Sequence, residues 1–354
     1  MTPAPTPHPL ESLHADLFHL LERLPHHKHG ELIQLALTTL VNMANDEIDR
    51  LDWKICNAAL RDMEKAFRSF YPYRHTRKIA IFGSARIAPG TIEYEMARKF
   101  AERVIEHGFM VITGAGPGIM QAGNEGAGKD QSFGLNIQLP FEQGSNPYVE
   151  GDKMVPFKYF FTRKLFFLKE SDALAMFPGG FGTQDETFEC LTLCQTGKSS
   201  PVPLVLVDKP GGHYWHDWDD YIQRQLLNRG LISPEDPSIY TITDDIDVAC
   251  ETIAHFYRVF HSCRYVGNRL VIRLNSELLE EDMEMLNQEF SDILVKGRIE
   301  QSAPLPQEAQ DATVGVSRIL LYFNQRDLGR LYQLINTINA VGLRSEATER
   351  PERK

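Results

Sequence analysis

The chain has 354 residues, of which 42% are hydrophobic and 24% charged, and its formal net charge is −11. This length allows a large core and suggests one large domain with additions, or two to three units. The acidic balance argues against a nucleic-acid partner, and no apolar run approaches the roughly 18 residues that span a membrane. We therefore expect a soluble, cytoplasmic protein that binds neither nucleic acid nor a membrane.

Residues 1–74 are expected to form a disordered tail followed by a helical extension. Residues 1–9 are rich in proline and lack the basic and apolar regions of a signal peptide. Between residues 10 and 70, apolar side chains recur at helical spacing. The cluster of His26, His27 and His29 could bind a metal ion, but adjacent histidines on a polar loop are usually solvated.

Strands and helices alternate over residues 75–262. Apolar strands are expected at 79–82, 109–113, 133–139, 173–177 and 202–207. Helices are expected at 92–106, from 117, at 157–169, after Thr183 and at 215–227, with a final pair ending near 260. This order predicts an α/β fold, a Rossmann-like, doubly wound parallel sheet that binds its ligand beyond the carboxyl ends of the strands.

Residues 263–354 predict a small C-terminal α+β appendix. Strands are expected at 269–274 and 319–323, helices at 278–290 and 328–338, and a polar linker at 297–317. The segment carries no recognisable chemical motif, so a role in oligomerisation or regulation is a hypothesis.

The cysteines follow no spacing typical of a metal site or a disulfide framework. Cys190 and Cys194 lie one helical turn apart and could offer two thiolates, but two small buried residues are favoured. We expect no metal ion and a reducing compartment. The five cysteines are Cys56, Cys190, Cys194, Cys250 and Cys263.

A glycine-rich segment at 178–186, Pro-Gly-Gly-Phe-Gly-Thr-Gln-Asp-Glu, joins an apolar strand to a helix. Glycines at a helix N-terminus let backbone N–H groups approach a bound phosphate. Thr183 and Glu186 also fit a capping box, which would only satisfy backbone donors. The glycines and the two carboxylates, Asp185 and Glu186, favour an anion site beside an acid/base site.

Two further loops follow predicted strands. Gly114, Gly116 and Gly118 do not have the spacing of a dinucleotide-binding loop, and either a second phosphate cradle or a tight turn would explain them equally well. Ser84 and Arg86 follow the first strand, at the same expected edge. Residues 123–130 nearly match an ATP-binding loop, but Asp130 replaces the Ser or Thr that would hold Mg²⁺, so we expect no ATPase.

Residues 178–186 resemble the PGGxGTxxE motif of the LOG family. Phe-Phe-Thr-Arg-Lys at 160–164 and Gln195-Thr-Gly-Lys198 resemble a bacterial long form of that family, and the resemblance covers about residues 77–260. LOG proteins are nucleoside 5′-monophosphate phosphoribohydrolases, including cytokinin-activating enzymes, and were once described as lysine decarboxylases. A pyridoxal-binding lysine signature does not stand out here.

The resemblance implies hydrolysis of a purine nucleoside 5′-monophosphate, such as AMP or a cytokinin riboside monophosphate, to free base and ribose 5-phosphate. It implies no cofactor and a homodimer or higher homo-oligomer. Glu186 would stabilise positive charge on the ribose or activate water, by analogy with other glycoside hydrolyses, and Arg163 would help the leaving base. The substrate-binding candidates are Ser84, Arg86, Gly114, Gly116, Gly118, Glu142, Lys164, Gly179, Gly180, Gly182, Thr183, Asp185 and Thr192. A non-catalytic nucleotide-binding or sensing protein is the alternative.

Overall fold

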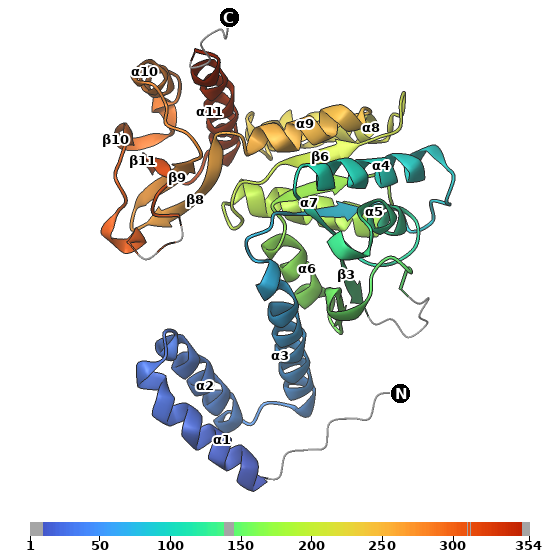
Figure 1. Cartoon of the computed structure of the whole chain (residues 1–354), viewed down its shortest axis with the longest axis vertical. Coiled ribbons are helices and arrows are strands. Elements are labelled where there is room, and N and C mark those ends of the chain that lie inside the picture. The colour runs from blue at the N-terminus through green and yellow to red at the C-terminus, as the bar shows by residue number, and fades with distance from the viewer. Residues whose placement is uncertain (1–9, 138–144, 310, 312, 349–354) are drawn as a thin grey trace, which may run out of the picture. The chain divides into compact units, whose positions relative to one another are not determined.

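The computed structural model describes residues 10–137, 145–309, 311 and 313–348 (Figure 1). The expected disordered tail at residues 1–9 lies outside them. The chain divides into two compact units, with the division after Leu60. None of the helices in the described part of the chain combines the length and the apolar composition needed to cross a bilayer.

The first unit is helical. It contains α1 (Leu10–Arg23), the short helix Leu24–His26, α2 (Gly30–Asn45) and the first half of α3 (Arg50–Phe70). The first residue of α2 is glycine, because a Cβ at position 30 would lie only 2.0 Å from the carbonyl oxygen of Leu24. Among the described residues, no group of three or more metal-ligating side chains is placed to hold an ion.

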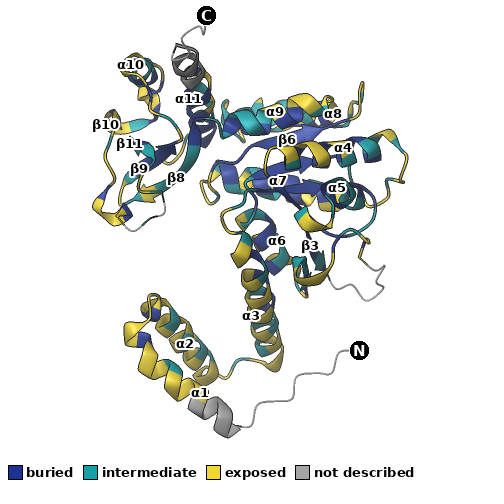
Figure 2. Ribbon diagram, in the orientation of Figure 1, coloured by how far each residue is buried: buried dark blue, intermediate teal, exposed yellow. Residues whose placement is uncertain are grey.

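The second unit is built on a seven-stranded, wholly parallel sheet with the order β4-β3-β2-β1-β5-β6-β7. The expected α/β, Rossmann-like fold is confirmed. Every residue of β1, β2, β5 and β6 is buried, as expected for strands covered on both faces (Figure 2). The strands are β1 (Lys78–Phe82), β2 (Met110–Thr113), β3 (Ser132–Ile137), β4 (Met154–Phe157), β5 (Ala173–Met176), β6 (Leu204–Val207) and β7 (Tyr240–Thr243).

The helices between these strands are α4 (Ile92–Glu106), α5 (Ile119–Ala127), α6 (Phe160–Lys169), α7 (Phe181–Gln195) and α8 (Tyr214–Tyr221), and α9 (Ile246–Phe256) follows the last strand. The helix expected near 157–169 is present as α6, but its start was placed too early, because β4 ends at Phe157 and α6 begins at Phe160. β4 is a four-residue edge strand containing Pro156, and proline is tolerated at a sheet edge. Its apolar residues run directly into those of α6.

A second sheet near the C-terminus is antiparallel, with the order β10-β11-β9-β8. Its strands are β8 (Phe260–Val266), β9 (Arg269–Leu274), β10 (Leu294–Gln301) and β11 (Ser317–Phe323), and its helices are α10 (Glu280–Glu289) and α11 (Leu328–Thr348). The expected α+β character is confirmed, but the linker expected at 297–317 was wrong over residues 297–301, which belong to β10. β10 is an edge strand with mostly exposed side chains, so its composition resembles that of a linker.

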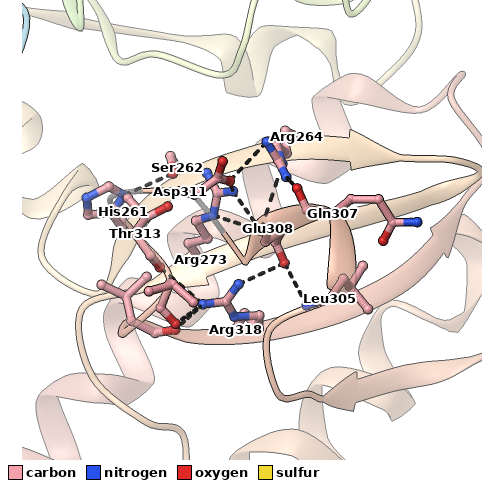
Figure 3. Close-up of polar contacts among 12 residues, drawn as sticks. His261, Ser262, Arg264, Arg273, Leu305, Gln307, Glu308, Asp311, Thr313 and Arg318 are labelled. Carbon is pink, nitrogen blue, oxygen red and sulfur yellow. Dashed lines mark hydrogen bonds and ion pairs between the residues drawn. The ribbon is translucent and has the colours of Figure 1, made fainter. Parts of the chain in front are cut away.

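A cluster of charged side chains lies on one side of this second sheet. It joins arginines of the strands to two carboxylates of the segment between β10 and β11. Glu308 is fully buried and accepts hydrogen bonds from Arg273 (2.6 Å to Nη2) and Arg318 (2.7 Å to Nη1), as Figure 3 shows. Asp311 pairs with Arg273 at 2.8 Å and with Arg264 at 3.0 Å. Burial favours the neutral acid, but the arginine hydrogen bonds hold the pKa of Glu308 below its ordinary value.

Helix α11 joins the two sheets of the second unit through buried polar contacts. The hydroxyl of Tyr332 donates to the carbonyl oxygen of Val202 and accepts from its N–H, both at 3.0 Å. The side-chain oxygen of Asn339 accepts from the N–H groups of Val259 and Phe260 at 2.8 and 3.0 Å. The α+β region is therefore packed onto the parallel sheet.

Candidate active site

A cleft of about 730 Å³ opens at the carboxyl ends of β1, β2 and β5. The strand order reverses here, because β1 lies between β2 on one side and β5 on the other. Ligands of open α/β sheets bind at such a reversal point. The loop after β1, Gly114 at the end of β2, the loop after β5 and one face of α6 line the cleft.

The three loops contact one another so closely that some of their glycines are required by packing. The N–H of Ser84 donates to the carbonyl oxygen of Pro178, and the carbonyl oxygen of Ser84 accepts from Ile119, both at 3.1 Å. Gly118 has φ +68°, and a Cβ there would lie 2.3 Å from the same Ser84 oxygen. A Cβ at Gly179 would lie 2.1 Å from Oγ1 of Thr183.

Gly180 and Gly182 differ from these glycines. Neither has a positive φ, and a Cβ added to either would meet no atom of the described residues within 4 Å. Both line the cleft at the N-terminus of α7, where the first backbone N–H groups have no acceptor within the helix. The free protein does not need glycine at these two positions, whereas a ligand seated on the helix N-terminus would.

The proposed capping box at Thr183 and Glu186 was wrong. Helix α7 begins at Phe181 and its N-cap is Gly180, which makes no side-chain cap. The carbonyl oxygen of Gly180 accepts from the N–H groups of both Thr183 and Gln184 at 3.1 Å, so the helix has already begun before Thr183. Thr183 is a buried residue of the first turn.

Arg163 extends from α6 into the space beside Gly114. Its Nε donates to the carbonyl oxygen of Leu135 at 2.7 Å, and its guanidinium lies 5.1 Å from the centre of the Phe167 ring. A Cβ at Gly114 would lie 2.3 Å from Nη2 of Arg163. Burial lowers the pKa of Arg163 to about 10, against the charge of Glu186, which favours the cation. Gly114 therefore makes room for an arginine.

Glu186 is 7% exposed, and its Oε2 atom has no hydrogen-bond partner in the part of the chain that the structure describes. The nearest cation is Lys164, whose Nζ lies 3.8 Å from that oxygen. Burial raises the pKa of Glu186 to about 7. Lys164 and Arg163 oppose this shift, whereas Glu189 and Asp185 reinforce it.

Lys164 is shared among three carboxylates of α7. Its Nζ lies 2.9 Å from Oδ2 of Asp185 and also forms a hydrogen bond with Glu189. Burial alone would lower the pKa of Lys164, but the hydrogen bonds to Glu189 and Asp185 raise it above its ordinary value. Lys164 is therefore a fixed cation.

The remaining predicted site residues separate into those inside and outside the cleft. Ser84 and the exposed Arg86 line it, and the N–H of Arg86 donates to Oγ of Ser84 at 3.1 Å. Gly116 and Gly118 are not among its lining residues. Thr192 is exposed on α7, outside the cleft, and its hydroxyl donates to the carbonyl oxygen of Phe188. Glu142 lies outside the described residues.

The structure adds two positioning residues that sequence reasoning missed. The hydroxyl of Tyr214 donates to the carbonyl oxygen of Gly179 and accepts from Nε2 of Gln184, both at 2.6 Å, which braces the glycine-rich loop. Asp62 of α3 accepts from Thr162 and from the N–H groups that open α6, at 2.8 Å from Oγ1 of Thr162 and 3.0 Å from N of Lys158. Neither residue lies in a motif, so the sequence carried no signal for them.

Residues 117–253 match a family model described as a possible lysine decarboxylase. The matched span is less than half of the chain and contains Arg163, Lys164 and the glycine-rich segment 178–186. None of the curated proteins compared with the chain matches it.

Several solved structures are similar to this chain. The X-ray structure of TM1055, a structural genomics target, is 20% identical, and the match covers 50% of this chain and 98% of that one with a TM-score of 0.35. The molybdenum cofactor carrier protein of Chlamydomonas reinhardtii is 17% identical, with coverage of 51% and 96% and a TM-score of 0.34. DNA processing protein A of Helicobacter pylori is 18% identical, with coverage of 50% and 80% and a TM-score of 0.33. At these values the likeness bears on neither ligand nor reaction.

Proposed function

We propose that this chain is a LOG-family phosphoribohydrolase that cleaves purine nucleoside 5′-monophosphates, AMP or a cytokinin riboside monophosphate, to the free base and ribose 5-phosphate. The observation that carries the proposal is the environment of Glu186. Glu186 is a buried carboxylate that lines the cleft, its pKa is raised, and its Oε2 accepts no hydrogen bond from the described residues. Arg163 lines the same cleft, and Nζ of Lys164 lies 3.8 Å from that oxygen. Such a carboxylate is stabilised only when a ligand supplies its missing partner.

The cleft offers a place for each part of such a substrate. The N-terminus of α7, with the open positions Gly180 and Gly182, would hold the phosphate, and Ser84 would contact the nucleotide. When the N-glycosidic bond breaks, the bonding electrons leave with the base and positive charge develops at C1′. The Glu186 carboxylate would stabilise that charge and accept a proton from the attacking water as the oxygen bonds to C1′. That proton would then pass to the departing base, whose negative charge Arg163 would offset, and Glu186 would be regenerated.

A decarboxylase is disfavoured by the state of Lys164. A lysine that forms a Schiff base with pyridoxal phosphate needs a lowered pKa, so that its amine can act as a nucleophile. Lys164 instead contacts three carboxylates that hold its charge in place. The family description therefore does not fit Lys164, which contacts Glu186 from outside the lining of the cleft.

We further propose a homodimer or larger homo-oligomer in the cytoplasm. Phe181 is 96% exposed and Phe160 is 54% exposed at the rim of the cleft, and large apolar side chains of this kind favour burial against another surface. All five cysteines are free, which fits a reducing compartment.

The test is a base-release assay. Purified protein is incubated with AMP and with a cytokinin riboside monophosphate, and the free base is measured by chromatography. We expect release by the wild type and a loss of about 10²–10⁴-fold in Glu186→Gln, with nucleotide binding retained. Saturable binding without release would instead identify a nucleotide sensor, and wild-type turnover in Glu186→Gln would refute the role of Glu186.

A further inference from the structure

A second cavity, of about 700 Å³, lies on the other side of α6 from the candidate active site. It shares no lining residue with the cleft. Helices α6 and α7 form one wall, the segment 198–202 forms another, and β8 of the C-terminal sheet closes it. Phe161 and Leu165 make one part of its surface apolar, and a volume of this size accommodates a small metabolite.

The polar part of the cavity contains groups that lack partners. Lys198 is exposed at the edge of the lining, and its ammonium has no ion-pair or hydrogen-bond partner among the described residues; Ser199 and Ser262 lie in the same lining. Ser171 is 8% exposed, and its Oγ has no hydrogen-bond partner in the described part of the chain. A buried hydroxyl without a partner is uncommon in proteins unless something else binds it.

The other charged groups of the cavity already have partners. Lys169 pairs with Glu170, Asp172 accepts from the backbone N–H of Lys78 at 2.9 Å, and Glu189 pairs with Lys164. His261 contacts the hydroxyl of Ser262, and burial with nearby arginines lowers its pKa, which favours its neutral form. Two lysines and two carboxylates line the cavity, and Lys198 is the one of these four groups that has no partner among the described residues.

Glu189 connects the two cavities physically. It lines the second cavity, whereas its partner Lys164 also contacts Asp185 and Glu186, which line the first. Helix α6 contributes Arg163 to the cleft and Leu165 to the second cavity, so the two spaces use different faces of one helix.

We propose that the cavity between α6, α7 and β8 binds a small anion, phosphate or carboxylate, through Lys198, Ser171 and the neighbouring serines, and that its occupancy regulates the cleft through Glu189 and Lys164. The proposed anion binding does not depend on the proposed hydrolase activity, whereas the proposed regulation rests on it. The C-terminal α+β region then contributes a wall of an effector site.

The direction of the regulation follows from the charges. Glu186 is faced by Lys164 and Arg163 from α6 and by Asp185 and Glu189 from its own helix. An added anion on the Glu189 side draws the Lys164 ammonium toward the second cavity and away from Glu186. Glu186 is then protonated more readily, so turnover at neutral pH falls and the acidic limb of the rate profile moves to higher pH.

The binding arm uses the full chain and isothermal titration with orthophosphate, pyrophosphate and citrate as separate probes, which distinguishes a phosphate from a carboxylate ligand. We expect Lys198→Glu to weaken binding of the preferred probe at least tenfold. Lys99→Glu, which changes an exposed lysine of α4 that lines neither cavity, should leave it unchanged. Equal affinities in the wild type and both variants, or no binding of any probe, would overturn the site.

The regulatory arm measures base release against pH with and without the bound probe. We expect the probe to inhibit the wild type at neutral pH and to shift its acidic limb upward. Glu189→Gln removes a carboxylate from the lining, so it should bind the probe at least as tightly as the wild type and yet lose the shift. Binding without any shift in the wild type would overturn the coupling. If no base is released under any condition, the hydrolase proposal fails while the binding arm still decides the anion site.

Discussion

Two buried glutamates in the second unit differ in the hydrogen bonds that their carboxyl oxygens accept. Glu308, in the antiparallel sheet, is fully buried, and arginines donate to both of its oxygens. Glu186, in the parallel-sheet cleft, is nearly as buried, yet one oxygen has no hydrogen-bond partner among the described residues. The pKa of Glu308 lies below its ordinary value, whereas that of Glu186 is raised to about 7. Burial is common to both, and the missing partner is what separates a candidate functional group from a structural one.

The largest expected effect on stability is that of Glu308→Gln. The change leaves the arginine side chains around it with uncompensated charge, which costs about 3–5 kcal/mol in comparable buried pairs. Urea unfolding measures the loss. Glu284→Gln, which breaks the exposed pair with Arg298, is the matched control and should have little effect. Turnover per folded molecule should be unchanged in both, and an unshifted unfolding midpoint in Glu308→Gln would contradict the assignment of this glutamate as structural.

Glu186→Gln should increase the stability of the protein, whereas Glu308→Gln should reduce it. The size of the increase should depend on pH. The folded-state pKa of Glu186 is above its ordinary value of 4.5, so the folded protein holds this proton more tightly and the wild type loses stability as pH rises from 4.5 through 7. A pKa of about 7 corresponds to a loss of up to about 3 kcal/mol. We expect Glu186→Gln to gain stability relative to the wild type between pH 5 and pH 8, measured by urea unfolding. If the difference in free energy of unfolding between variant and wild type is the same at pH 5 and pH 8, the pKa of Glu186 is not raised by folding.

Lys164→Met sharpens the comparison by removing the cation nearest to Glu186. Lys164 lowers the pKa of Glu186, so its loss should raise that pKa further. If the carboxylate is the active form, kcat/KM for base release rises with pH through about 7 in the wild type, and this limb moves to higher pH in the variant. Lys209→Met, at an exposed lysine paired with Glu93, should leave the profile unchanged. If the acidic limb of the pH profile is unchanged in Lys164→Met, then Lys164 does not influence the pKa of Glu186.

The smallest expected effect separates glycines that packing requires from glycines that a ligand requires. Gly182→Ala adds a Cβ that meets no atom of the described residues within 4 Å and should stabilise α7 by up to about 1 kcal/mol. The same Cβ lies in the cleft and should weaken nucleotide binding. Gly179→Ala should instead destabilise the protein, because its Cβ would collide with Thr183. Thermal unfolding and nucleotide titration of the two variants provide the test, and equal stability changes would contradict it.

The sequence predicted the parts of the fold whose signal is local. The strands near 79–82, 109–113 and 173–177 are apolar runs buried on both faces, and such runs stand out. β4 was missed because a four-residue edge strand containing proline adjoins an aromatic helix. β10 was missed because an exposed edge strand has the composition of a loop.

The site was predictable to the extent that it sits on loops at one sheet edge. Arg163, Glu186 and Gly180 lie in one cleft, as expected for loops that follow neighbouring parallel strands, and their roles in binding and catalysis stay predictions. The start of α7 was misplaced because the Gly180 carbonyl, and not a side chain, begins the helix. Asp62 and Tyr214 act across long separations in the chain, and no single sequence records such contacts.

The contact between Asp62 and α6 sets a lower limit on how far the protein can be shortened. Asp62 stands within α3, just past the division between the two units, and its carboxylate receives the N–H groups that open the helix carrying Arg163 and Lys164. A fragment starting at residue 75, where the α/β alternation begins, would retain every motif of the candidate site and still lack this acceptor. The shortest fragment that keeps this support for α6 should therefore begin upstream of residue 62, although no motif marks this part of the helical extension.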